Sequence, residues 1–280
     1  MKTALLAVLV SSITLAAPRP ARDTADVGKQ GDYSVGIFNP LRIAILDGIE
    51  LEANPLVFFV APNVNARFRV IGGPLRLTAE AGLSVPTFGM RLMKGFFFPT
   101  WATTKNDIGW MLIPRVGVLL SGTVFEHSVW TARTDAAFRV PLGPNSGTPL
   151  NSFVAPLDLL LAAPLTGVCA RVGGSYDHAL GDTFRIRGEA NLFITGGQGN
   201  LYDAGTNLGA LAPLSQLIVT AHLGLDIAVF KQSRITVGVL FANHDTGASQ
   251  VVKGADGFSD RVRVRSNNFL PTLDYIWAGF

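Results

Sequence analysis

Three long segments of the chain alternate strictly between apolar and polar residues. They cover Leu75–Val85, Thr183–Ile194 and Leu217–Val229 and are 11, 12 and 13 residues long. Because successive side chains on a β-strand point to opposite faces, each segment predicts a strand with one apolar and one polar face. Strands in soluble proteins typically have about 5–6 residues, whereas a tilted strand that crosses a bilayer needs about 9–11. The length of the runs therefore favours membrane-spanning strands.

Weaker alternation and turn signals divide the rest of the chain into further strands. The fold class predicted is all-β: an antiparallel up-and-down transmembrane β-barrel of about 12 strands, with a range of roughly 10 to 14, over residues 33–280. The weaker strands are expected at residues 33–46, 49–60, 64–71, 110–120, 128–140, 167–178, 234–243 and 270–280. Long connections are expected at 86–107, 141–152, 195–213 and 244–265. All four long connections can lie on one side of the membrane only if residues 153–163 do not form a spanning strand, or if residues 33–46 split into two strands at Asn39-Pro40.

The N-terminus has the three-part plan of a secretory signal peptide. Lys2 precedes an apolar run, and small residues follow at Ala16 and Ala17. We expect residues 1–16 to be a signal peptide that exports the protein to the outer membrane, and residues 17–32 to be a polar lead-in without periodicity.

Composition narrows the class of protein. Hydrophobic residues make up 48% of the chain and charged residues only 15%, against about 25% charged in average proteins. This balance excludes a disordered chain. Past the N-terminus, the best candidate for a spanning helix, Phe153–Leu165, is interrupted by two prolines and an aspartate. One cysteine, Cys169, excludes a disulfide framework and a multi-cysteine metal site.

The polar faces of the predicted strands carry arginine but no lysine. Eleven arginines face eight carboxylates there, and the lysines fall in the lead-in or in connections. Arginine suits enclosed ion pairs better than lysine does, so we expect the polar faces to enclose a lumen. Two interpretations stay open: the charges form a network that plugs the barrel, or they line a narrow pore with a weak preference for anionic solutes. The predicted pore-lining residues are Arg76, Glu80, Arg115, Arg133, Asp135, Arg171, Arg185, Arg187, Glu189, His222 and Asp226.

The end of the chain resembles that of bacterial outer-membrane β-barrel proteins. The chain stops on Phe280, with Tyr275 and Trp277 just before it. Trp110 and Trp130 join these three as expected membrane-interface residues. The resemblance is to a barrel that is porin-like in general plan, and it implies that the terminal strand contacts the barrel-assembly machinery. It also implies outer-membrane lipid and lipopolysaccharide as partners. No nucleic-acid partner is expected, and the sequence leaves the oligomeric state open.

Candidate catalytic chemistry is sparse. Glu126-His127-Ser128 places an acid, a base and a hydroxyl side by side, but on a strand His127 faces away from the other two. Asp245-Thr246-Gly247 is too near the end of the chain to begin an aspartic-protease domain. No catalytic residue, metal ligand or cofactor is predicted, so a non-catalytic pore or structural membrane protein is expected. The alternatives are a soluble secreted or periplasmic all-β protein with an apolar sandwich core, and a barrel enzyme that modifies lipid.

Overall fold

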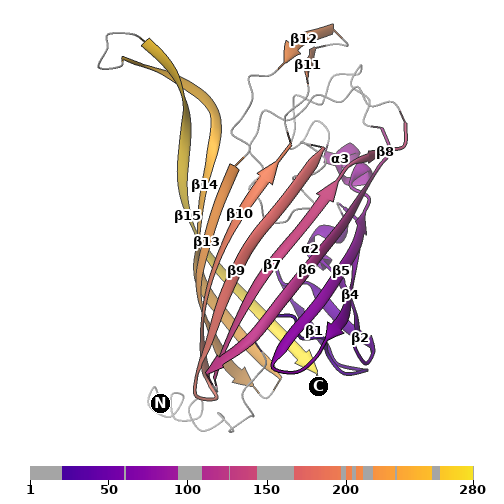
Figure 1. Cartoon of the computed structure of the whole chain (residues 1–280). Helices are drawn as coiled ribbons and strands as arrows, with labels where there is room; N and C mark the ends of the chain where they lie inside the picture. Colours follow the sequence, from indigo (N-terminus) through magenta and orange to yellow (C-terminus); the bar gives the residue numbers. More distant parts are fainter. Residues whose placement is uncertain are drawn as a thin grey trace, which may run out of the picture.

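Twelve antiparallel strands form a closed barrel in the computed structural model (Figure 1). The structure describes residues 21–59, 61–93, 109–125, 127–143, 167–196, 200–203, 206–210, 217–230, 232–253 and 259–279. The barrel strands are β1 (Tyr33–Gly36), β2 (Leu41–Leu46), β3 (Ile49–Ala53), β4 (Asn63–Ile71), β5 (Leu75–Ser84), β6 (Met111–Phe125), β7 (Ser128–Phe138), β9 (Val168–Leu180), β10 (Phe184–Thr195), β13 (Leu217–Phe230), β14 (Ser233–Lys253) and β15 (Ser259–Gly279). The three strictly alternating segments correspond to β5, β10 and β13, and the predicted fold class and strand number are confirmed.

The ring closes because each strand pairs with a neighbour on both sides. The last strand, β15, returns to pair with β1, with Tyr33 opposite Gly279, and β5 pairs with β6 over ten residues. β8 (Val140–Pro141) lies beside the start of β6, and β11 (Asn200–Asp203) and β12 (Thr206–Ala210) form a separate two-stranded sheet. Within the described ranges the helices are α2 (Pro55–Phe58) and α3 (Thr87–Met93), and neither is long enough to span a membrane.

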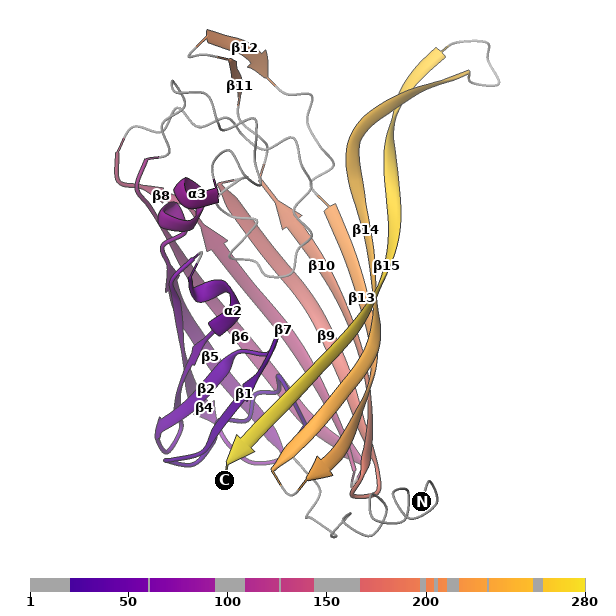
Figure 2. The ribbon, with the colours of Figure 1, turned by 180° about the vertical axis from the view of Figure 1, so that it is seen from behind.

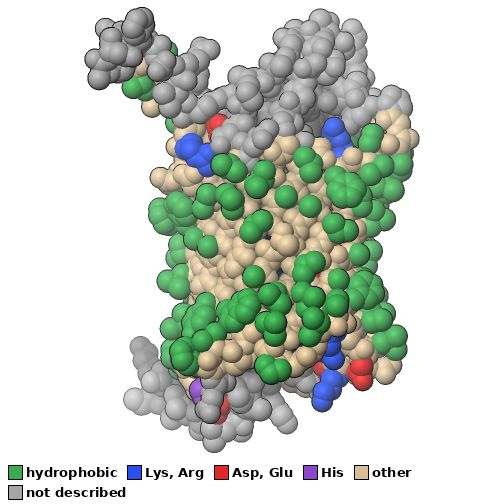
Figure 3. Space-filling model, viewed as in Figure 1, with side chains coloured by type: hydrophobic (Ala, Val, Ile, Leu, Met, Phe, Trp, Pro, Cys, Tyr) green, Lys and Arg blue, Asp and Glu red, His purple; other side chains and the backbone are tan. Residues whose placement is uncertain are grey.

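The polarity of the barrel is the reverse of that of a soluble protein. Leucine, valine, isoleucine and phenylalanine side chains cover the outer wall, with a dense band near the end that carries the short turns (Figure 3). The buried side chains include many arginine, aspartate, glutamate and threonine side chains, together with apolar ones such as Ile113, Leu119 and Phe193. The sandwich alternative required the apolar faces to meet each other in a core, and that expectation is wrong.

Short turns and long connections lie at opposite ends of the barrel. The described chain ends beside the short turns (Figure 1), which include Asp47-Gly48 and Gly181-Asp182. Gly48 and Gly181 have φ angles of +87° and +72°, which favour glycine in a tight turn. Residues 33–46 do split at Asn39-Pro40 into β1 and β2, so the second of the two topological alternatives holds. Residues 153–163 lie outside the described residues.

Two predicted boundaries are corrected. Residues 49–60 are not one strand, because β3 ends at Ala53 and the chain turns into α2. Pro55 is compatible with the first turn of a helix and cannot donate a ladder hydrogen bond. Residues 244–265 were expected to be a loop, but β14 and β15 continue through most of them as a paired hairpin with an irregularity between Asp245 and Ser249. This hairpin extends well beyond the barrel rim (Figure 2).

Candidate functional site

The interior of the barrel holds the polar side chains that the sequence singled out. The eleven predicted pore-lining side chains lie on the inner side of the wall, buried or half-buried, on strands β5, β6, β7, β9, β10 and β13. Ten of them make ion pairs within the lumen, and the remaining one, His222, places Nε2 2.9 Å from the Thr272 hydroxyl. That these residues line an open pore stays a prediction.

A continuous ion-pair network crosses six neighbouring strands of the inner wall. It begins on β3 and ends on β9 and consists of Glu50–Arg67 (2.6 Å), Arg67–Glu80 (3.1 Å), Glu80–Arg115 (3.6 Å), Glu80–Arg133 (3.6 Å), Arg133–Asp135 (3.4 Å) and Asp135–Arg171 (2.7 Å). Each charged group faces at least one of opposite sign, as buried charges require.

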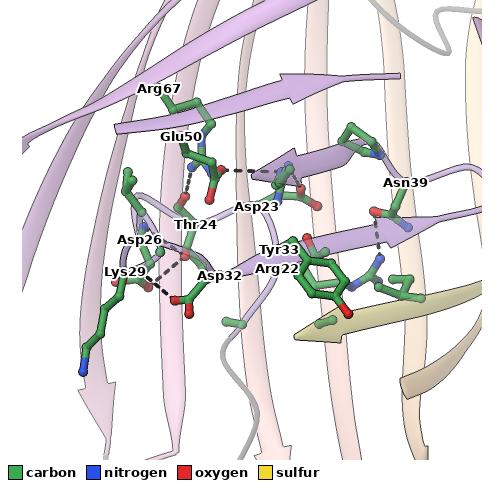
Figure 4. A pocket seen from close by; sticks show the side chains of 18 of the residues that line it. Arg22, Asp23, Thr24, Asp26, Lys29, Asp32, Tyr33, Asn39, Glu50 and Arg67 are labelled. Carbon is green, nitrogen blue, oxygen red and sulfur yellow. Dashed lines mark hydrogen bonds and ion pairs between the residues drawn. The ribbon is translucent and has the colours of Figure 1, made fainter. Parts of the chain in front are cut away.

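Residues 21–32, here called the N-terminal segment, precede β1; residues 21–28 lie buried or half-buried inside the lumen, and residues 29–31 are exposed. The Arg22 guanidinium contacts the Asp226 carboxylate of β13 at 2.9 Å. Asp23 lies between Arg42 of β2 at 2.5 Å and Arg187 of β10 at 3.3 Å. These two strands are separated by four strands one way around the ring and six the other, so Asp23 bridges nearly opposite walls. Figure 4 shows Arg22 and Asp23 lying among side chains of the wall.

The wall also binds the backbone of the N-terminal segment. The Ala25 N–H donates to the Ser121 hydroxyl at 2.7 Å, and the Thr78 hydroxyl donates to the Ala25 carbonyl at 2.6 Å. Arg67 donates to the Thr24 carbonyl, a contact drawn in Figure 4. Polar backbone groups enclosed by protein need such partners. Because the segment lacks alternation, its sequence predicts only a polar lead-in. The charges of Arg22 and Asp23 are the signal that points to a place among charged side chains.

The electrostatic surroundings keep Asp23 ionised. Burial by itself raises the pKa of its carboxyl group, but the guanidinium groups of Arg42, Arg187 and Arg22 outweigh that effect and lower the pKa well below its ordinary value. The Asp23 carboxylate therefore acts as a fixed anion inside the lumen.

Two cavities adjoin the N-terminal segment. The larger, of about 400 Å³, lies between the segment and strands β1 to β4, β14 and β15 (Figure 4). The smaller, of about 170 Å³, is lined by Asp23, Asn65 and residues close to the ends of β4, β5 and β6 that face the long connections. We call this second space the arginine cavity, because Arg42, Arg115, Arg133 and Arg171 line it.

Four of the five predicted membrane-interface residues are described, and they lie on the outer surface toward the two ends of the barrel. Trp110 is half exposed at the start of β6, with the Arg91 guanidinium 5.3 Å from its ring centre. Trp130, Tyr275 and Trp277 lie toward the end with the short turns, and Phe280 is outside the described residues. Their contact with a membrane interface stays a prediction.

The structure describes only part of the sequence motifs considered for catalysis. Glu126 lies outside the described residues. The Ser128 hydroxyl is 2.7 Å from Nδ1 of His178, a serine–histidine contact that the sequence did not predict. Ser128 is fully buried. Among the described side chains, no group of three or more potential ligands has a geometry that holds a metal ion.

Comparisons with known proteins found only solved structures of low similarity. No family model matches the chain, and no curated protein matches it. The outer-membrane-expressed OmpT of Vibrio cholerae is 12% identical over 86% of this chain and 64% of that chain, with a TM-score of 0.44. OmpT of the same organism folded in vitro is 12% identical over 92% and 71%, with a TM-score of 0.42. A Pseudomonas aeruginosa FadL homologue is 9% identical over 88% and 68%, with a TM-score of 0.36. The chain thus spans less than two thirds of the length of the first of these proteins.

The architecture itself decides the class. A closed, even-numbered antiparallel barrel with short turns at one end, an apolar outer wall and a polar interior is the form in which strands cross an outer membrane. The chain therefore has an outer-membrane-type β-barrel fold.

Proposed function

We propose that this barrel is a non-catalytic, narrow pore with a preference for small anionic solutes, and that its own N-terminal segment restricts the passage. The observation that carries the proposal is the charge of the inner wall. Its ten arginines, against eight carboxylates, leave an excess of positive charge: Arg42, Arg67, Arg69, Arg76, Arg115, Arg133, Arg171, Arg185, Arg187 and Arg234 against Glu50, Glu52, Glu80, Asp135, Asp177, Glu189, Asp226 and Asp274. An excess of one sign along a narrow passage selects for the opposite ion.

The N-terminal segment is held by contacts that water can replace. Its side chains make ion pairs, and its backbone accepts hydrogen bonds from hydroxyl and guanidinium groups. The only cysteine, Cys169, is buried in β9, so no disulfide fixes the segment. These features support a restriction that is able to move.

A closed structural barrel is the second candidate. The bridge that Asp23 makes between β2 and β10 favours it, because the segment then ties two nearly opposite walls together. In this case the segment stabilises the barrel and no solute passes.

Planar-bilayer conductance separates the two candidates. The purified protein should give small channels whose reversal potential in a salt gradient indicates anion preference, and a variant that lacks residues 21–32 should give larger ones. A substituted variant, Asp23→Asn, provides the same comparison without a deletion. Heat-modifiable migration on a detergent gel verifies that each barrel is folded. Cation preference contradicts the proposed pore, and folded barrels without conductance in all three proteins support the structural role.

Location, partners and the absence of catalysis belong to the same proposal. Export by the N-terminal signal predicts recovery in the outer-membrane fraction, and recovery as a soluble periplasmic protein contradicts it. The exposed Trp277 near the end of β15 is consistent with contact between the terminal strand and the barrel-assembly machinery. An unchanged lipid profile in a deletion strain is expected for a barrel without enzymatic activity.

A further inference from the structure

The arginine cavity carries more positive than negative charge. Four guanidinium groups line it, and its two carboxylates, Asp23 and Glu52, both already contact one of them, Arg42, at 2.5 Å and 2.8 Å. The other three guanidinium groups contact carboxylates that do not line the cavity: Arg115 contacts Glu80 at 3.6 Å, Arg133 contacts Asp135 at 3.4 Å and Arg171 contacts Asp135 at 2.7 Å. Three cations thus share two carboxylates.

The contacts of Arg133 are long for an enclosed ion pair. Its guanidinium lies 3.4 Å from Asp135 and 3.6 Å from Glu80, whereas a charge-assisted hydrogen bond measures about 2.7–2.9 Å. Nε of Arg133 is buried and has no hydrogen-bond partner among the described residues. An enclosed cation with such weak compensation is costly unless an anion approaches it.

Asn65 is an independent sign of a ligand. It lines the same cavity from β4, is only 7% exposed, and neither Nδ2 nor Oδ1 has a hydrogen-bond partner in the part of the chain that the structure describes. Its side chain lies over Gly82 of β5, where a Cβ atom would be 2.7 Å from Oδ1. Gly82 therefore leaves room for this amide. A buried amide without a hydrogen-bond partner is unusual, because buried polar groups normally have partners.

We propose that the arginine cavity binds a small carboxylate anion. The planar fork of Arg133 presents paired donors to the two carboxylate oxygens, and the Asn65 amide donates to the same group. A volume of about 170 Å³ accommodates a small organic acid. This inference names the solute class of the proposed pore and rests on that proposal for its physiological meaning, but binding itself requires no open passage.

Isothermal titration calorimetry on the full mature protein in detergent tests the site, with succinate, acetate and phosphate as probes at low ionic strength. Succinate or acetate should bind saturably. Asn65→Leu and Arg133→Gln should each weaken binding by about tenfold or more, because each removes a hydrogen bond to a charged group. The control variant Arg139→Gln removes an exposed positive charge at the rim, outside the cavity, and should leave binding unchanged.

Several results would overturn the assignment. These are the absence of saturable carboxylate binding, binding that neither cavity variant weakens, an equal loss in Arg139→Gln, and tighter binding of phosphate than of either carboxylate. Gly82→Ala, which displaces the Asn65 amide without changing charge, replaces Asn65→Leu if that variant does not fold. Binding without conductance refutes the pore and leaves the site standing, whereas anion-selective conductance without binding refutes the site alone.

Discussion

Arg67 is the most enclosed cation of the ion-pair network, and its removal should destabilise the barrel strongly. Its side chain is only 2% exposed and contacts Glu50 at 2.6 Å and Glu80 at 3.1 Å. The change Arg67→Met keeps a long side chain but leaves two buried carboxylates with weaker partners. The nearest remaining cations are 3.9 Å from Glu50 and 3.6 Å from Glu80.

The expected loss follows from these distances. Removing one partner of a buried ion pair typically costs about 3–5 kcal/mol. The residual cations partly compensate both carboxylates, so we expect a value at the lower end, about 3 kcal/mol. Equilibrium urea unfolding in phospholipid vesicles measures the free energy of unfolding, and the double change Arg67→Met with Glu80→Gln should recover part of the loss because it removes one of the stranded charges.

A substitution of a second arginine serves as the matched control. Arg76 lies on the adjacent strand β5 and pairs at 3.4 Å with Asp26, whose side chain is 42% exposed. Because water reaches the Asp26 side of this pair, the pair is closer to a surface ion pair, which contributes about 0–1 kcal/mol, and Arg76→Met should cost less than Arg67→Met. Equal losses in the two variants, or an Arg67→Met protein as stable as the unmodified one, would refute the view that the enclosed network stabilises the barrel.

Three further predictions concern the outer wall, the first turn and the N-terminal segment. Leu223→Arg, on the outer face in the middle of β13, should lower the free energy of unfolding in vesicles by about 2–4 kcal/mol. Phe230→Arg, at the end of that strand, should lower it by only about 0–1 kcal/mol, since the penalty depends on depth in the bilayer. Equal costs contradict a lipid-facing wall. Asp274→Asn should cost about 1–3 kcal/mol, because this carboxylate accepts hydrogen bonds from the Ile37 and Phe38 N–H groups at 2.8 Å and 3.2 Å; faster hydrogen exchange in β1 checks it. The lowered pKa of Asp23 predicts that the N-terminal segment stays bound at pH 4 and is released only as the pH falls through that lowered value. The reason is that stabilisation by this carboxylate is complete above its ordinary pKa of about 3.9. Conductance that rises already between pH 6 and 5 contradicts this prediction.

The sequence predicted the long strands well and the short ones poorly, for a physical reason. In β5, β10 and β13 residues alternate between the apolar outer wall and the polar lumen, so alternation persists over the whole strand. In β1 to β3 the strands have 4, 6 and 5 residues, which is too short for periodicity to mark their ends. The extended hairpin of β14 and β15 was also missed, because beyond the barrel rim no apolar surroundings enforce alternation.

The position of the N-terminal segment could not be predicted from the pattern of apolar and polar residues. Its place in the lumen depends on single contacts, such as the Asp23 bridge and the hydrogen bond from Thr78 to the Ala25 carbonyl, and such contacts leave no period in the sequence. Residue types alone gave a nearly balanced inner wall and could not distinguish a plug from a pore. The structure changes that question, because the wall has an excess of two positive charges. The three aspartates of the segment, opposed by Arg22 and Lys29, reduce this excess to one. A segment bound by its own carboxylates in a lumen rich in arginine occupies the position that an anionic solute would take, so plug and anion preference are two consequences of one charge distribution.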